Sequence, residues 1–276
     1  MHDAPLLQMG LSPLRAARWI EPDGDYPHMR QHKLRTRERL DACVYQALPQ
    51  SRDAQTELAR ALQTYLLHHH SNLYGSTANE LVYLPTGQAL CDAPAEPLWQ
   101  SSLWIADDLL LLQASEGTYR LTAASLCSPS HWRLEDKMGL PLVDIHAPVP
   151  GLRERIGANI ERFMAHLKPA HPVERFNWSL QAHDALCARD PQPDYVDAAT
   201  ELFYRTERQT LRRLPQTGAI VFTIRVYLHS LSALQQVPHC LARLRSAIAS
   251  SPPAMRQYKH FATYQAALEK YRGDAR

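Results

Sequence analysis

The chain has 276 residues, and its 30 Lys and Arg nearly balance its 28 Asp and Glu, which gives a formal charge of +2. This length supports a sizeable core in one large or two small domains and excludes disorder over most of the chain. Without a long basic block, the near-neutral charge argues against nucleic-acid binding. No apolar run approaches the roughly 18 residues that span a bilayer, and acidic Asp3 stands where a signal peptide would be basic. We therefore expect a cytoplasmic protein that does not bind membranes.

The cysteines and glycines exclude several common kinds of site. The cysteines are scattered and never form a C-x-x-C pair, so they predict neither a disulfide framework nor a zinc or iron–sulfur site; they are Cys43, Cys91, Cys127, Cys187 and Cys240. We interpret most of them as small buried hydrophobes. No G-x-G-x-x-G or G-x-x-x-x-G-K-S/T loop is present, so nothing indicates a nicotinamide dinucleotide or nucleoside triphosphate held in that way.

The first thirty-odd residues show no clear period and are predicted to form an extended arm on the surface. Apolar residues at helical spacing then predict helices over Arg37–Leu48 and Ala54–Leu67, the second with Ser51 as its N-cap. The run His68–His70 ends this helix. Consecutive helical residues point about 100° apart and cannot all bind one metal ion, so we interpret the run as a solvated helix end.

The middle of the chain combines strands with a long loop. Strands are predicted over Leu81–Leu84, Leu103–Gln113 and Thr118–Cys127, with a tight turn at Glu116-Gly117 and a surface loop over Pro85–Trp99. The segment Ser128 to Gly151 contains four prolines, and loops of this length in compact domains are commonly functional. It includes His146. A single histidine in an apolar setting is either a hydrogen-bonded core residue or a ligand, and Pro148 and Pro150 would hold a ligand in a fixed direction.

The last part of the chain predicts a helix, three strands and helices. The helix covers Leu152–Leu167, and the first strand, Val173–Leu180, places Arg175, Asn177 and Ser179 opposite Phe176, Trp178 and Leu180. Residues Glu201 to Ser230 form a hairpin around a Pro215–Gly218 loop. In its second strand the even positions, from Ile220 to Leu228, form an apolar face, and the odd positions form a face polar enough to line a pocket. Helices are expected near Val237–Ile248 and from Phe261 to Tyr271.

Arginine dominates the polar positions of the hairpin's first strand, which holds Arg205, Arg208, Arg212 and Arg213 with Glu207. The planar guanidinium suits carboxylates and phosphates. The alternative is an edge strand with surface ion pairs, each contributing about 0–1 kcal/mol.

The order of elements predicts the fold class. Two strands, helical material and three antiparallel strands resemble the PAS domain, an α+β fold with a curved antiparallel sheet and a helical cover over a ligand cavity. We expect one domain over residues 1–276, with an N-terminal arm and helices (1–75), a PAS-like core (80–230) and a C-terminal helical tail (231–276). Fold alone does not give function.

Three blocks carry a family resemblance: WRLEDKMGLPLVDIHAPVPG (132–151), VERFNW (173–178) and TERQTLRRLPQTGAIVFTIRVYL (206–228). They resemble the haem-dependent oxidative N-demethylase alpha-subunit family, which includes the large subunit of dimethylamine monooxygenase. The arm from Trp19 to Tyr26 and the Ala54–Leu67 helix also fit, so that the resemblance covers roughly residues 10–260.

The resemblance implies a b-type haem in a PAS-like pocket, where dioxygen oxidises a methyl group of a small secondary amine to a carbinolamine that releases formaldehyde. Electrons would come from NADPH through FMN and a [2Fe-2S] centre in reductase or ferredoxin subunits, since this chain has no motif for either group. The alternatives are a non-catalytic haem or small-molecule sensor and an interaction module with an empty pocket.

With this family in view, His146 becomes the expected axial ligand of the haem iron, with His166 as second choice and Cys127 as third. Arg208 and Arg212 share a strand face and are expected to bind the propionates, unless they form an ion network with Glu207. Further cofactor-binding candidates are Arg175, Trp178 and Arg225. An alkylammonium substrate requires a carboxylate or an aromatic face, for which Glu207, Trp178 and Tyr227 are candidates, and Asn177 is a possible hydrogen-bonding partner for oxygen or substrate.

Overall fold

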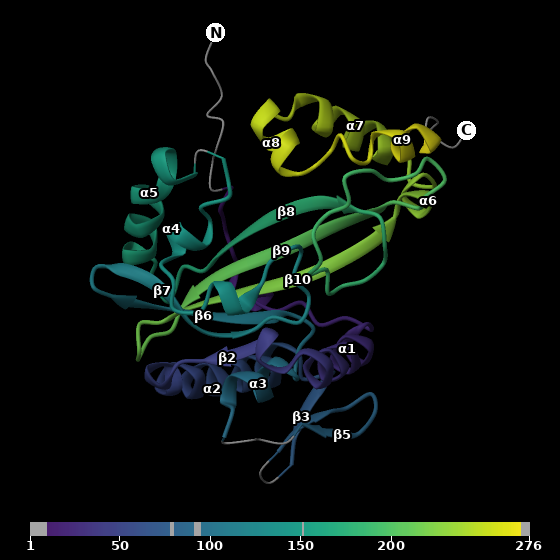
Figure 1. Ribbon diagram of the computed structural model, residues 1–276. Helices are drawn as coiled ribbons and strands as arrows, with labels where there is room; N and C mark the ends of the chain where they lie inside the picture. Colours follow the sequence, from purple (N-terminus) through teal and green to yellow (C-terminus); the bar gives the residue numbers. More distant parts are fainter. Residues whose placement is uncertain (1–9, 78–79, 91–94, 151, 272–276) are drawn as a thin grey trace.

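The computed structural model describes residues 10–77, 80–90, 95–150 and 152–271, and within these all side chains except those of residues 152–156 and 158. Asp3 and Cys91 lie outside the described residues. A large antiparallel sheet crosses the molecule, with helices on both of its faces (Figure 1). This arrangement confirms a mixed α/β protein built on a large antiparallel sheet.

Seven strands of the described chain form this sheet in the order β1-β8-β9-β10-β6-β7-β2, and every neighbouring pair is antiparallel. Their bounds are β1 (Ser12–Pro13), β2 (Tyr45–Ala47), β6 (Asp108–Ser115), β7 (Thr118–Ser125), β8 (Val173–Gln181), β9 (Phe203–Arg213) and β10 (Ile220–Ser230). A separate small sheet has the order β3-β4-β5, with bounds Tyr74–Ser76, Leu81–Tyr83 and Gln88–Leu90.

The helices fall into three groups along the chain. Before β6 lie α1 (Tyr26–Leu40), α2 (Arg52–His69) and α3 (Pro97–Ser102), with the 3-10 turns η1 (Ala16–Arg18), η2 (Asp41–Cys43) and η3 (Pro49–Ser51). Between β7 and β8 lie η4 (Leu134–Asp136), α4 (Leu142–Ile145) and α5 (Leu152–His166). After β10 come α6 (Leu231–Leu234), α7 (Cys240–Ser250), α8 (Pro253–Tyr258), α9 (Gln265–Leu268) and η5 (Glu269–Tyr271). We call the last group the C-terminal unit.

The two faces of the sheet carry different cores. One face packs on α2 and on residues 14–25, an irregular segment that we call the arm, through a cluster that includes Trp19, Leu58, Leu62 and Val221. We name this side the arm face. The opposite side, which we name the α5 face, packs on η4, α4 and α5 through Leu134, Ile145, Ile160, Met164, Leu211 and Ile220. Figure 1 shows α1 and α2 on one side of the sheet and α4 and α5 on the other.

The predicted hairpin is confirmed as β9 and β10. Their register runs without a break from Arg213↔Ile220 to Phe203↔Ser230. Gly218 has φ +70°, a left-handed conformation that glycine adopts without steric cost. The Glu57 carboxylate of α2 accepts from Gln216 N at 2.7 Å, Thr217 N at 2.8 Å and Thr217 Oγ1 at 2.6 Å. The turn is therefore anchored to a helix 160 positions away in the sequence.

The prediction for the start of the chain is wrong in two places. The arm gives way to α1 at Tyr26, and residues Tyr45–Ala47, placed in a helix by their spacing, form β2 beside β7. Asp41 has φ +39°, which an α-helix does not allow, so α1 ends at Leu40. The buried residues of α1 do have helical spacing, but they are Tyr26, Met29, Lys33 and Thr36, and the two polar ones conceal the pattern.

The strand predicted from Leu103 begins later, as β6 at Asp108. Buried Lys33 explains the delay, because its Nζ donates to the carbonyl oxygens of Ser102 at 2.8 Å, Ile105 at 3.3 Å and Asp107. These carbonyls converge on one ammonium and so cannot extend a ladder. The turn at Glu116-Gly117 is confirmed, with φ +52° and +80°.

The other predicted elements largely hold. Helices α2, α5 and α7 and strands β4, β7 and β8 lie close to their expected bounds. Ser51 occupies the N-cap of α2, but its Oγ donates to Leu48 O and makes no capping bond. The expected loop before Trp99 contains β5 and the start of α3, and the helix expected over 261–271 is divided into α9 and η5.

The histidine run at the end of α2 separates as its geometry requires. His68 and His69 are exposed, whereas His70 is half-buried, with its Nε2 3.2 Å from Ile20 O and from Tyr65 Oη. Among the described residues no group of three or more His, Cys, Asp or Glu side chains is arranged to hold a metal ion. No helix in the described part of the chain is long and apolar enough to cross a membrane.

Candidate functional site

The burial of β10 does not follow its polarity. The polar odd positions Thr223 and Arg225 are 0% and 2% exposed. Thr223 shares a hydrogen bond with Thr210, and the arm covers Arg225 through Asp23 and Asp25. On the apolar even face, Phe222 and Ile224 are only half-buried beside α4 and α5. Ile220 and Val226 on the same face are buried, so the apolar face is partly open only around Phe222 and Ile224. An apolar surface of this kind suits a flat hydrophobic ligand.

His146 ends α4 at the border of this face. It is partly buried, and its Nδ1 donates to Leu142 O at 2.9 Å. With the proton on Nδ1, the Nε2 lone pair remains available to a metal. Burial lowers the pKa of His146, and the positive charges of Arg175 and Lys137 lower it further. The imidazole is therefore neutral at physiological pH, which is the form that ligates iron.

Arg175 shares the α5 face, on β8 opposite Gln209 of β9. Its Nε is buried and finds no hydrogen-bond partner in the described part of the chain. Burial lowers the pKa of Arg175, and the Glu207 carboxylate opposes this shift. A buried guanidinium nitrogen without a partner costs free energy unless another group satisfies it; Arg175 shares this feature with Arg30 and Arg225 and is the one of the three on the α5 strand face.

Glu207 and Asn177 face each other across β8 and β9, also on the α5 face. Glu207 Oε1 accepts from Arg205 Nε at 3.0 Å, while its Oε2 accepts from Gln209 Nε2 at 3.0 Å and Asn177 Nδ2 at 3.4 Å. Arg205 is fully buried and also donates to Ser128 O and Leu186 O, which ties the loops after β7 and β8 to the sheet. The three donors therefore hold the Glu207 carboxylate in one orientation on the α5 face.

Lys259 completes this group from the C-terminal unit, and the sequence analysis did not identify it. Its Nζ donates to Trp178 O at 2.5 Å and to Asn177 Oδ1 at 3.4 Å. Burial lowers the pKa of Lys259 to about 8, with Arg175 lowering it and Glu207 raising it. No local pattern could have revealed it, because a lysine directly after a short helix near the C-terminus is an ordinary surface residue.

The arginines expected to bind propionates lie on the arm face, away from His146. Arg208 donates to Arg18 O at 2.5 Å, Trp19 O at 3.3 Å and Glu174 Oε2 at 3.0 Å. Arg212 lies 4.4 Å from the centre of the Trp19 ring. Arg225 donates to Asp23 at 2.9 Å and Asp25 at 3.2 Å. Together they fasten the arm to the sheet, so the structure does not bring them into one site with His146.

Two aromatic candidates are likewise separated from His146. By strand alternation Trp178 and Tyr227 belong to the arm face, where Trp178 stacks on Phe261 at 5.3 Å and Tyr227 lies 4.7 Å from the Arg225 guanidinium. Among the described candidates the α5 face therefore holds His146, Arg175, Asn177 and Glu207, with Lys259 added.

The two alternative axial ligands are less suited to bind iron. His166 is exposed near the end of α5, where its Nδ1 bonds Arg162 O at 2.7 Å within the helix. Cys127 is fully buried among Val44, Trp99 and Leu103, and burial raises the pKa of its thiol. A protonated, enclosed thiol is a poor ligand, because thiolate is the form that binds metals.

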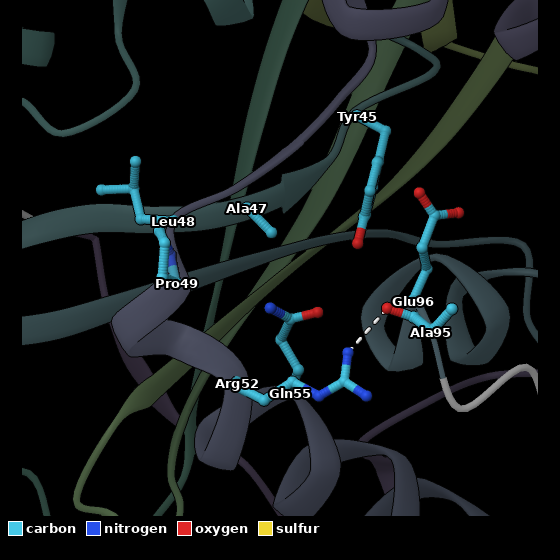
Figure 2. A pocket seen from close by; sticks show the side chains of 8 residues that line it. All are labelled: Tyr45, Ala47, Leu48, Pro49, Arg52, Gln55, Ala95 and Glu96. Carbon is cyan, nitrogen blue, oxygen red and sulfur yellow. Dashed lines mark hydrogen bonds between the residues drawn. The ribbon is translucent and has the colours of Figure 1, made fainter.

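A surface cavity lies where β2, α2 and the residues before α3 meet (Figure 2). Its volume is about 270 Å³. It is lined by Tyr45, Ala47, Leu48, Pro49, Arg52, Gln55, Ala95 and Glu96. Arg52 donates to Ala95 O at 2.6 Å, and Glu96 is bound bidentately by Arg37 at 2.7 Å. Its charged groups are thus engaged with the protein itself, and none of the predicted site residues lines it.

These observations define an α/β protein with a neutral imidazole and an unsatisfied guanidinium on a partly open apolar sheet face. Residues 10–269 match the family model of the haem-dependent oxidative N-demethylase, alpha subunit-like proteins. The chain belongs to this family. The name of the family indicates haem dependence and oxidative N-demethylation, and the words "alpha subunit" in it imply further subunits.

Proposed function

We propose that this chain is the haem-binding subunit of a monooxygenase that removes a methyl group from a small secondary amine, of the dimethylamine type, and releases formaldehyde. The observation that carries the proposal is the presence, on one face, of His146 with its Nδ1 bonded to Leu142 O and of Arg175, whose buried Nε has no partner among the described residues. These are the two polar groups that a haem requires of its pocket.

We place the b-type haem of this proposal on the α5 face, because residues there offer each kind of group that a haem needs. A haem needs an axial donor, a partner for its propionates and an apolar slot for the macrocycle. His146 would supply the first and Arg175 the second, while Phe222, Ile224 and their neighbours from α4 and α5 supply apolar walls. When bound, the haem supplies the redox chemistry that activates dioxygen.

The central part of the sheet supports the PAS-like comparison. A two-stranded hairpin (β6–β7), helical material (α4–α5) and a three-stranded meander (β8–β9–β10) follow one another, and the meander joins the hairpin through β10 and β6. In this interpretation α4 and α5 are the cover of the ligand cavity, and the arm and C-terminal unit are additions to one domain.

The remaining polar residues of the face would position the amine. Glu207 offers a carboxylate that is 12% exposed and held by three donors, so that it can attract an alkylammonium without moving. Asn177 adds an adaptable amide beside it. Trp178, Tyr227 and the arginines of the arm face are not needed in this arrangement.

Electrons would reach the chain from separate subunits. We propose a reductase that carries NADPH-derived electrons through FMN and a [2Fe-2S] centre, because this sequence contains no glycine loop or cysteine motif for those groups. The alpha-subunit designation of the family supports a complex of this kind.

The test is an absorption spectrum of protein purified from cells supplied with iron and a haem precursor, recorded before and after reduction. We expect a Soret band that shifts on reduction and with carbon monoxide. The band should fall from near-stoichiometric to trace haem in His146→Ala and persist in His166→Ala, a matched histidine with a similar backbone bond. Loss of haem only in His166→Ala would transfer the axial role. Bound haem without formaldehyde release in the presence of a reductase would favour the sensor alternative.

A further inference from the structure

Lys259 makes contacts on both faces of one strand. Asn177 and Trp178 are consecutive in β8, so their side chains project from opposite faces of the sheet. The Lys259 Nζ lies 4.5 Å from the centre of the Trp178 ring, 2.5 Å from the Trp178 carbonyl oxygen and 3.4 Å from Asn177 Oδ1. The side chain therefore passes round the outer edge of β8.

This edge is open at that point. Strand β1 pairs only with Val173 and Glu174, at the beginning of β8. Beyond Glu174 no strand of the described chain lies on the outer side of β8. Lys259 thus reaches Asn177 from the open outer edge of β8, and the stacking of Phe261 on Trp178 holds the chain beside it.

The chemistry of the two neighbours fixes the Asn177 side chain in one orientation. A lysine ammonium has only donors and an ionised carboxylate has only acceptors. Asn177 accepts from Lys259 through Oδ1 and donates to Glu207 through Nδ2 at 3.4 Å. Rotating the amide by 180° would place its NH₂ against the ammonium and its oxygen against the carboxylate, and both contacts would be repulsive.

We infer that Lys259 is a positioning residue of the α5 face: it orients the Asn177 amide and thereby holds the Glu207 carboxylate ready for a cationic ligand. The role of Glu207 toward an amine rests on the proposed function, whereas the orientation of Asn177 does not. The C-terminal unit consequently becomes part of the site and is more than a structural addition.

The ionisation of Lys259 gives this arrangement a pH dependence. The charged groups that face it are Glu207 on β9 and Arg175 on β8, and Tyr258 and His260 flank it in the chain. Burial lowers the pKa of Lys259 to about 8. Raising the pH through this value removes the ammonium charge, so that the neutral amine no longer forces the amide into one orientation.

The first experiment does not require haem. The side-chain amide signals of Asn177, labelled with ¹⁵N and assigned with Asn177→Ala, are followed by NMR from pH 6 to 10. In the wild type we expect them to titrate near pH 8 with Lys259. In Lys259→Met this titration should disappear, and in Lys259→Arg it should move out of the range, because a guanidinium stays charged. Unchanged titration in Lys259→Met would overturn the inference.

The second experiment measures the consequence for turnover in the reconstituted complex. Lys259→Met should lower kcat/KM for the amine about tenfold, the effect of losing one charge-assisted hydrogen bond. It should also abolish the fall in kcat/KM near pH 8 and leave the Soret band intact. If Lys259→Met keeps the wild-type kcat/KM and pH profile, the inference is wrong. A wild type without haem would disprove the proposed function, and the amide titration would still decide the role of Lys259.

Lys270 provides the matched control. It belongs to the same C-terminal unit, donates to a backbone carbonyl (Ala199 O, 3.3 Å) and lies 5.5 Å from the Tyr271 ring, and its contacts with the described residues include none of the site. Lys270→Met should leave the Asn177 titration and the pH profile unchanged. If it reproduces the effects of Lys259→Met, docking of the C-terminal unit explains both variants and the positioning role is refuted.

Discussion

Asp107 shows how unfavourable a single buried charge is in this fold. Its side chain is 1% exposed, and neither carboxylate oxygen has a hydrogen-bond partner among the described residues. Burial raises the pKa of Asp107 to about 6, although Arg225, Lys33 and Arg208 oppose the shift. The folded protein therefore holds a proton on this group at pH values where the unfolded chain, with a pKa of about 3.9, has released it.

The sign of the resulting pH dependence follows from proton uptake. Between about pH 4 and pH 6 the folded state binds more protons at Asp107 than the unfolded state, so the free energy of unfolding falls as the pH rises. Asp107→Asn removes this contribution. Relative to that variant, the wild type should lose up to about 3 kcal/mol between pH 4 and pH 7, since one pKa unit corresponds to about 1.4 kcal/mol.

Urea unfolding at pH 4, 5, 6 and 7 measures this difference for wild type and Asp107→Asn. Exposed Asp194 supplies the control, because Asp194→Asn should follow the wild type at every pH. A wild-type-minus-variant difference that stays constant with pH would show that Asp107 does not titrate differently in the folded state.

At the residue scale, strand alternation predicted part of the site. It placed Arg175 and Asn177 on one face of β8, and these residues do share the α5 face with Glu207. It could not show which face of the β9 strand turns toward His146, because that depends on where the 128–151 loop packs. Arg208 and Arg212 were grouped with His146 for this reason, and the arm now occupies their face.

At the element scale, long periodic segments were predictable and short ones were not. Helix α2, helix α5 and the β9–β10 hairpin have enough residues for their period to appear in the sequence. Strands β1 and β2 have two and three residues and exist because a neighbouring strand offers an edge. Such non-local pairing leaves no local pattern.

The turn of the hairpin offers a test of long-range anchoring. Glu57→Gln leaves one oxygen but replaces the other by an NH₂ group that faces the donors of Gln216 or Thr217. Hydrogen bonds to charged groups contribute about 1.5–3 kcal/mol each, and an unsatisfied donor costs a similar amount. We therefore expect Glu57→Gln to lower the free energy of unfolding by about 2–3 kcal/mol.

Chemical denaturation measures this loss, and hydrogen exchange at the Gln216 and Thr217 amides shows whether the turn itself is released. The control is Glu38→Gln on α1, whose side chain is exposed and should change stability by less than about 0.5 kcal/mol. Equal exchange rates in wild type and Glu57→Gln would contradict the anchoring role.

On the scale of the whole molecule, the two faces of one sheet have different tasks. The arm face carries fully buried arginines that bind the protein itself: Arg208 donates to Glu174 and to carbonyls of the arm, and Arg225 donates to Asp23, although its Nε has no partner among the described residues. On the α5 face the Nε of Arg175 has no partner among the described residues, and His146 donates to Leu142 O through its Nδ1. Stability and ligand binding should consequently respond to different arginines.

Arg208→Met and Arg175→Met separate the two tasks. Arg208 is 1% exposed, and its replacement removes the hydrogen-bond donors of the Glu174 carboxylate and of two carbonyl oxygens of the arm. Arg208→Met should therefore lower the free energy of unfolding by about 3–5 kcal/mol. Trypsin should then cut faster at Arg15 and Arg18 in the released arm, while the folded fraction keeps its haem. Arg175→Met removes an unsatisfied buried nitrogen, so stability should hold while haem affinity falls about tenfold to a hundredfold with the loss of a charge-assisted bond.

Haem titration of the folded fractions, urea unfolding and timed trypsin digestion together distinguish these outcomes. The control is Arg243→Met at an exposed position, which should change neither haem affinity, stability nor the rate of digestion. The opposite result, in which folded Arg208→Met loses haem and Arg175→Met retains it, would return the propionate role to Arg208. It would also require the haem to lie on the arm face, where the arm would have to leave the sheet to admit it. The energy of that rearrangement, several kcal/mol of buried ion pairs, is the reason we expect the α5 face to hold the cofactor.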